Sequence, residues 1–186
     1  MKRTHIKTVA DLLHWEPYLT DAQIDEMKAV ACPASIEGIA APQDLNDITL
    51  GQLIQLESIG AEKGIFVAIA EALFHKNEEW AMNAPALEML GLRNMALAEQ
   101  ERISQMFASL HREPTAAQVM AGIENLNFGM FGLADWYARR MGINDHDTAF
   151  NTPWLRIWQC RKNDQEEAEF NERHMRYQQQ LMKAQR

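Results

Sequence analysis

The sequence of 186 residues contains little glycine, proline and valine, and only two cysteines. Its 9 Gly and 6 Pro fall below the average usage of globular chains, which excludes collagen-like and low-complexity classes. Valine occurs 4 times, and a chain so poor in this strand-forming residue is not expected to build a large sheet. Cys32 and Cys160 stand far apart and outside any C-x-x-C pair, so free thiols are expected instead of a disulfide scaffold.

Long hydrophobic runs are also missing, and with them the sequence signs of a membrane protein. No stretch approaches the roughly 18 apolar residues of a membrane span. The ends lack the apolar segment of a signal peptide, so we expect a cytoplasmic protein without a membrane partner. The net charge of -8 argues against a nucleic-acid partner, because such proteins usually carry a basic patch. The charge is uneven: residues 1–160 hold 12 basic and 21 acidic side chains, and residues 161–186 hold 6 and 5.

Helix formers and helix caps dominate what is present. Alanine occurs 25 times, and apolar residues recur at helical spacing between clear start and stop signals. We therefore expect an all-α protein, with one helical domain of about seven to eight helices. We divide the chain into an acidic helical domain, residues 1–162, and an amphipathic C-terminal helix, residues 163–186. Helix N-caps are predicted at Thr8, Thr20, Thr49, Asn83, Thr115 and Thr152.

Several local features qualify this helical pattern. Residues 33–47 read as a loop, with a short strand at 35–39 left open. A long helix is predicted from residue 85 to about 111, although Glu99 interrupts its apolar stripe and Gly91 leaves a break open. Residues 126–132 form an apolar turn punctuated by glycine, and the helix that follows is expected to end at Gly142.

The C-terminal segment holds the candidate partner-binding residues. Phe170, His174, Tyr177 and Leu181 form a narrow apolar stripe on an otherwise polar helix, which is typical of a helix docked on a partner. A break or a new cap near Asn163 or Asp164 separates this stripe from the preceding helix. Trp154 and Trp158 share a helix face, and core packing and interface anchoring both remain open for them. The predicted partner-binding set is therefore Trp154, Trp158, Phe170, Tyr177 and Leu181.

Metal chemistry has one candidate on a helix. The six histidines form neither H-E-x-x-H nor E-x-x-H, so a di-iron bundle is excluded by ligand spacing. Glu71, His75 and Glu79 are spaced by four and would lie along one helix face, where they would hold a metal only with further ligands. The alternative is an exposed polar stripe with weak side-chain pairs.

A second cluster, Asp145-His146-Asp147, lies in a predicted loop. A hydrolytic base or a metal site would look like this locally, and so would ordinary turn and cap chemistry. Phosphate-binding glycine loops and the G-x-S-x-G nucleophile motif are absent from the sequence. We therefore expect no enzyme activity, no cofactor and no bound metal, and keep a metal-dependent enzyme as the alternative.

Two stretches resemble a known family. The first is residues 45–56, which read LNDITLGQLIQL. The second begins with residues 121–129, which read AGIENLNFG, and ends with residues 163–170, which read NDQEEAEF. They are similar to tail assembly chaperones and related tail-morphogenesis proteins of tailed bacteriophages. The resemblance implies a small, mostly helical, non-catalytic protein that binds other phage proteins, with the tape measure protein as its client. It implies no catalytic residues.

These observations predict a protein–protein interaction protein of phage or prophage tail assembly. Its mechanism would be helix-in-groove recognition by the apolar anchors of the C-terminal helix. It would act in the host cytoplasm, with retention in the virion and homo-oligomer formation left open. A second alternative is an acidic inhibitor or regulator that binds a host factor through its negative surface.

Overall fold

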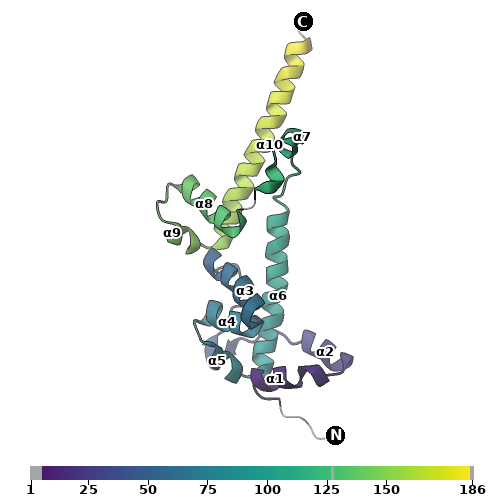
Figure 1. Cartoon of the computed structure of the whole chain (residues 1–186), viewed down its shortest axis with the longest axis vertical. Coiled ribbons are helices and arrows are strands. Elements are labelled where there is room, and N and C mark those ends of the chain that lie inside the picture. The colour runs from purple at the N-terminus through teal and green to yellow at the C-terminus, as the bar shows by residue number, and fades with distance from the viewer. Residues whose placement is uncertain (1–5, 127, 185–186) are drawn as a thin grey trace. The chain divides into compact units, whose positions relative to one another are not determined.

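The computed structural model describes residues 6–126 and 128–184 and confirms the all-α class. In this part of the chain there are ten α-helices, two short 3-10 helices and one hairpin of two-residue strands (Figure 1). Three of the helices, α5, α7 and α9, have only five or six residues. The sequence indicated about seven to eight helices, and the short helix α5 is one that it did not indicate. Within the described ranges, no helix has both the length and the apolar character needed to cross a membrane.

The chain forms two compact units, residues 1–104 and residues 105–186. This division differs from the expected one at residue 162, which falls inside a continuous helix. Helix α6 (Ala86–Ala108) begins in the first unit and ends in the second. The rest of unit 1 consists of α1 (Val9–Trp15), η1 (Glu16–Tyr18), α2 (Asp21–Lys28), β1 (Ser35–Ile36), β2 (Ile39–Ala40), α3 (Leu50–Lys63), α4 (Ile65–Phe74) and α5 (Glu78–Asn83). The rest of unit 2 consists of α7 (Ala116–Met120), η2 (Ile123–Asn125), α8 (Gly129–Met141), α9 (His146–Phe150) and α10 (Trp154–Ala184).

Reciprocal caps start four of the helices, as the sequence indicates. At α3, the Thr49 amide donates to Gln52 Oε1 at 2.9 Å and the Gln52 amide donates to Thr49 Oγ1 at 3.1 Å. The other three capping boxes belong to Thr8, Thr20 and Thr115. Each box satisfies two backbone N–H groups that the helix itself leaves unpaired.

The predicted cap at Asn83 is wrong. Asn83 is the last residue of α5, and its amide group donates to the Glu79 carbonyl. The N-cap of α5 is Asn77, whose side chain accepts from the Trp80 amide at 3.0 Å. The sequence predicts one helix start near Pro85, where α6 does begin. The structure has an additional helix, α5, before it, because Asn77 caps a helix that ends at Asn83.

The core of unit 1 lies around α4, whose sequence IFVAIAEALF is apolar at nine of its ten positions. Seven of its ten residues are buried, and it packs mainly against α3. Gly64, with φ of +91°, joins the two helices in a conformation that side chains rarely adopt. The hairpin of β1 and β2 lies in the loop that leads to α3, and Glu37 and Gly38 form its turn with positive φ values.

Helix α6 runs without a break at Gly91, and the glycine has a packing role instead. A Cβ atom at Gly91 would lie 2.0 Å from the carbonyl oxygen of Ala31. One turn further along α6, Asn94 Nδ2 donates to the carbonyl oxygens of Met27 at 2.8 Å and Val30 at 3.1 Å. Gly91 and Asn94 thus hold the C-terminal end of α2 and the residues just after it close against α6.

Glu99, which interrupts the apolar stripe of α6, binds the loop that precedes α3. Its Oε2 accepts from the Leu45 amide at 3.1 Å, and Arg102 Nε donates to its Oε1 at 2.8 Å. Arg102 also donates to Asn46 Oδ1 at 2.6 Å. Hydrogen bonds from Arg102 and Leu45 lower the pKa of the Glu99 carboxyl group.

The core of unit 2 is built on the first turns of α10. Trp154 and Ile157 are fully buried, together with Tyr137 of α8. Trp158 is half-buried, and its indole N–H donates to the Met106 carbonyl at 2.9 Å near the end of α6. This end of α10 therefore belongs to the folded body of unit 2.

The expected break near Asn163 or Asp164 is absent, because α10 is one continuous helix of 31 residues. Asn163 accepts a hydrogen bond from Gln159 Nε2 at 3.0 Å, one turn back along the helix. Asp164 binds the Arg140 guanidinium group of α8, with Nε and Nη2 both within 3.0 Å of its Oδ1. Both side chains are thus engaged without interrupting the helix, although residues of these types often cap a new one.

Candidate functional site

The five predicted partner-binding residues separate into two groups along α10. Trp154 has no exposed surface, and Trp158 is half-buried. Phe170, Tyr177 and Leu181 expose 57%, 66% and 63% of their surfaces. The core-packing alternative therefore holds for Trp154, and the exposed apolar surface begins at Phe170.

Two ion pairs fix the middle of α10 to the rest of unit 2. Arg140 binds Asp164, and Arg112 donates from Nη1 and Nη2 to the two carboxylate oxygens of Glu172 at 3.1 and 2.9 Å. The hydrogen bonds from Arg112 lower the pKa of the Glu172 carboxyl group and raise that of the guanidinium group. Paired, planar contacts of this kind orient a helix even where an exposed ion pair adds little stability.

Beyond Glu172, every residue of α10 from 173 to 184 is exposed. Figure 1 shows this distal part of α10, in yellow, extending past α7 and α8 of the same unit. A helical stretch of this length is only marginally stable in water when nothing packs against it. The helical conformation of residues 173–184, all of them exposed, is therefore the feature that most directly suggests a binding partner.

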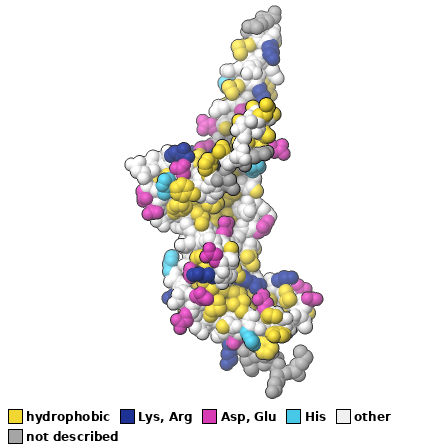
Figure 2. All heavy atoms as spheres, viewed as in Figure 1, with side chains coloured by type: hydrophobic (Ala, Val, Ile, Leu, Met, Phe, Trp, Pro, Cys, Tyr) yellow, Lys and Arg dark blue, Asp and Glu magenta, His cyan; other side chains and the backbone are white. Residues whose placement is uncertain are grey.

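The apolar stripe on α10 has the spacing of a coiled-coil seam. Phe170, His174, Tyr177 and Leu181 follow each other at steps of four, three and four, as apolar positions do when two helices pack side by side. The rings of Phe170 and His174 stack with centroids 6.0 Å apart. Figure 2 shows polar and charged side chains interspersed along this part of the chain, so the apolar surface is narrow. We call these four residues the α10 stripe.

A second set of exposed apolar residues in unit 2 was not singled out as a binding surface by the sequence. It lies on α7, on the turn after η2 and at the start of α8. The turn itself was predicted from its glycines, and Gly129 does adopt a positive φ of 53°. The exposed fractions are 90% for Met120, 63% for Leu126, 70% for Phe128 and 57% for Phe131. The sequence signal for this surface was only that apolar residues occur at a turn. Whether those residues are exposed depends on what the turn packs against, which local sequence does not show.

The first candidate metal cluster is not assembled. Helix α4 ends at Phe74, and His75 adopts a left-handed conformation with φ of 54°, so the helical spacing from Glu71 is interrupted there. Glu79 belongs to the next helix, α5, and Glu71 instead pairs with Lys63 at 3.2 Å. The assumption of one continuous helix face was therefore wrong. Among the residues that the structure describes, no group of three or more potential ligands gathers into a metal site.

The second cluster serves as a helix cap. Asp145 is the N-cap of α9, and its carboxylate accepts from the Asp147 amide at 3.1 Å and from the Thr148 hydroxyl at 3.2 Å. His146 Nε2 lies 3.2 Å from Asp135 Oδ1 of α8. The three side chains of the cluster thus do not converge on one point, and the cap interpretation is confirmed.

The cysteines are free, as expected, and both are half-buried. Burial raises the pKa of the Cys32 thiol, which disfavours the reactive thiolate form. The Cys32 thiol lies 3.4 Å from the Pro42 carbonyl oxygen, as a weak donor in the packed loop before α3.

No protein-family model, curated protein or solved structure matches the chain in the three comparisons with known proteins.

Proposed function

We propose that the protein is a non-catalytic interaction protein of phage or prophage tail assembly, and that its α10 stripe binds a helical segment of a client. The observation that carries the proposal is the exposed distal helix, fixed at its base by Arg112 and Arg140 and bearing apolar residues at coiled-coil spacing. The likeness of two sequence stretches to tail assembly chaperones suggests the class of client, a long helical tail protein such as the tape measure protein.

Recognition would proceed by side-by-side packing of helices. Burying a Phe, Tyr or Leu side chain against a partner contributes about 1.5–3 kcal/mol each before the cost of association. Three such residues in a narrow seam support binding that is specific in register but reversible.

The experiment compares co-purification from the native host by the full chain and by a chain truncated after Glu172. This truncation keeps Asp164 and Glu172, the ion-pair partners of Arg140 and Arg112. A truncation after Lys162 would remove both carboxylates, so a loss of binding could then result from unfolding of unit 2. We expect a long helical tail protein to co-purify with the full chain and to be lost with the truncated one. A tail protein retained equally by both chains would contradict the role of the stripe.

Single substitutions provide a matched pair within the same turn. Leu181→Lys places a charge in the stripe, and Met182→Lys places one on a different face of the helix at nearly the same exposure, 63% against 61%. Only the first variant should lose the client. Equal losses in both would indicate non-specific attraction to the helix.

A regulator of a host factor is the second candidate, and the charge distribution favours it. Residues 1–104 hold 16 acidic and 8 basic side chains, whereas residues 105–186 hold 10 of each. The whole negative net charge thus belongs to unit 1. Co-purification of a host enzyme whose binding weakens strongly with added salt and survives truncation of α10 would support this candidate.

A further inference from the structure

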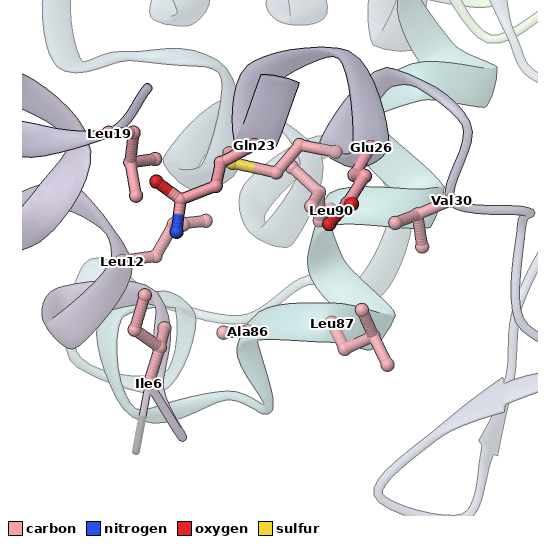
Figure 3. A pocket seen from close by; sticks show the side chains of 10 residues that line it. Ile6, Leu12, Leu19, Gln23, Glu26, Val30, Ala86, Leu87 and Leu90 are labelled. Carbon is pink, nitrogen blue, oxygen red and sulfur yellow. The ribbon is translucent and has the colours of Figure 1, made fainter. Parts of the chain in front are cut away.

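An open apolar groove lies in unit 1 where α1, α2 and the first turns of α6 meet. It has a volume of about 340 Å³, and its lining comes from Ile6, Leu12, Leu19, Gln23, Glu26, Met27, Val30, Ala86, Leu87 and Leu90. Leu12 and Leu90 are buried, and Leu87 is 66% exposed at its edge. Figure 3 shows the labelled lining side chains around the groove, from α1, α2, α6 and the segments that flank them.

The polar groups of the groove indicate the chemistry of its occupant. Two of its ten lining residues, Gln23 and Glu26, are polar, and both belong to α2. Asp25 of the same helix already pairs with Lys28, whereas Glu26 has no cationic partner in the described part of the chain. An apolar segment that carries basic side chains fits an apolar groove whose wall includes the Glu26 carboxylate, and the acidic surface of unit 1 favours its approach.

The chain itself contains such a segment. Residues 173–184 of α10 hold Arg173, Arg176 and Lys183 and no acidic residue. At about 3.6 residues per turn, these three cations lie on one side of the helix, next to the α10 stripe. Arg173 and Arg176 make only long, solvent-exposed ion pairs with Glu169 and Glu172, at 3.8 Å each. Distal α10 therefore combines an exposed apolar ridge with a basic flank, which complements the apolar lining and the Glu26 carboxylate of the groove.

We propose that the unit 1 groove of one copy binds the distal part of α10 of a second copy. Groove and helix are different surfaces, so the contact is head-to-tail, and an open chain of copies keeps one groove and one helix free at its ends. Such contacts build rings or open chains of copies. The contact uses the same helix as the proposed function, so a client that binds the α10 stripe would compete with self-association.

The first test is the concentration dependence of mass by analytical ultracentrifugation of the full chain without any client. We expect oligomers that grow with concentration and dissociate as salt is added. Leu87→Lys in the groove and Leu181→Lys in the α10 stripe should each weaken association at least about tenfold. Both residues are largely exposed, so the variants should fold normally. The controls are Leu97→Lys, on α6 but outside the groove lining, and Met182→Lys, and both should associate like the wild type.

The second test mixes the two deficient variants. Leu87→Lys retains an intact helix and Leu181→Lys retains an intact groove, so the mixture should form a 1:1 complex and nothing larger. Association of Leu87→Lys alone would overturn the proposal in favour of a symmetric pairing of two α10 helices. A full chain that stays monomeric at every concentration would also overturn it, and neither result would bear on client binding.

Discussion

Gly91 of α6 shows how one absent methyl group determines a helix contact. The Ala31 carbonyl occupies the space that a Cβ atom would need, at 2.0 Å from its ideal position. Gly91→Ala should therefore destabilise the fold by about 1–3 kcal/mol, because backbone atoms must move apart. Denaturant unfolding measures the change.

Gly60 of α3 provides the matched control. A Cβ atom there would lie 3.8 Å from that of Ala68, an ordinary contact. Gly60→Ala should be neutral or stabilising by up to about 1 kcal/mol, because alanine favours the helix. Similar losses in both variants would show that Gly91 has no special contact.

Glu99 gives a prediction on pH at the residue scale. Its pKa is lowered in the folded state by hydrogen bonds from Arg102 and Leu45, so its contribution to stability is complete above the ordinary pKa that the carboxyl group has in the unfolded chain. That contribution is lost as the pH falls through the lower pKa of the folded state. Glu99→Gln should cost about 1–3 kcal/mol at neutral pH, and the deficit should shrink toward pH 3.

Thermal unfolding of wild type and Glu99→Gln across this pH range measures the effect. A deficit that stays constant from neutral to acidic pH would show that the charge of Glu99 is not what stabilises the loop. At this scale the sequence showed only that Glu99 interrupts an apolar stripe. Its partner, the amide of Leu45, lies 54 positions away, and only the fold brings the two together.

At the scale of the element, α10 combines a buried start with an exposed end. Trp154→Ala should cost about 3–5 kcal/mol, because it leaves a cavity in the core of unit 2. Leu181→Ala should change stability by less than about 0.5 kcal/mol, because the side chain is largely exposed. Denaturant unfolding of the two variants in the absence of any partner separates core from surface. Equal costs would contradict the division of the five residues.

The stability of helix α2 depends on its contacts with α6 more than on its own sequence. The helix has no buried residue, and its C-terminal carbonyls are held by Asn94 of α6. Asn94→Ala should therefore speed amide hydrogen exchange in α2 by roughly tenfold, equivalent to about 1.4 kcal/mol, with little change in α4. Asn83→Ala, which removes a hydrogen bond within α5, should leave α2 unchanged. Exchange measured by mass spectrometry distinguishes the two.

At the scale of the whole molecule, the two units differ in charge, because all of the net charge of -8 lies in residues 1–104.

The response of the whole protein to divalent metal ions is a second property at this scale. In the described ranges, no metal cluster is assembled. Because Glu71, His75 and Glu79 belong to different local structures, Zn²⁺ or Mg²⁺ should not raise the thermal midpoint. A saturable rise that is lost in His75→Ala would restore the metal-dependent enzyme as a candidate.

The sequence by itself determined the helical class, the N-caps at Thr8, Thr20, Thr49 and Thr115, the glycine end of α8 and the spacing of the α10 stripe. These features depend on residues within one or two helical turns, and local hydrogen bonding and periodicity govern them. Only the tertiary structure decided that Trp154 is buried while Leu181 is exposed, that α10 continues past Asp164, and that a groove forms between α1, α2 and α6. Each of these depends on contacts between residues far apart in the chain, which no local pattern encodes.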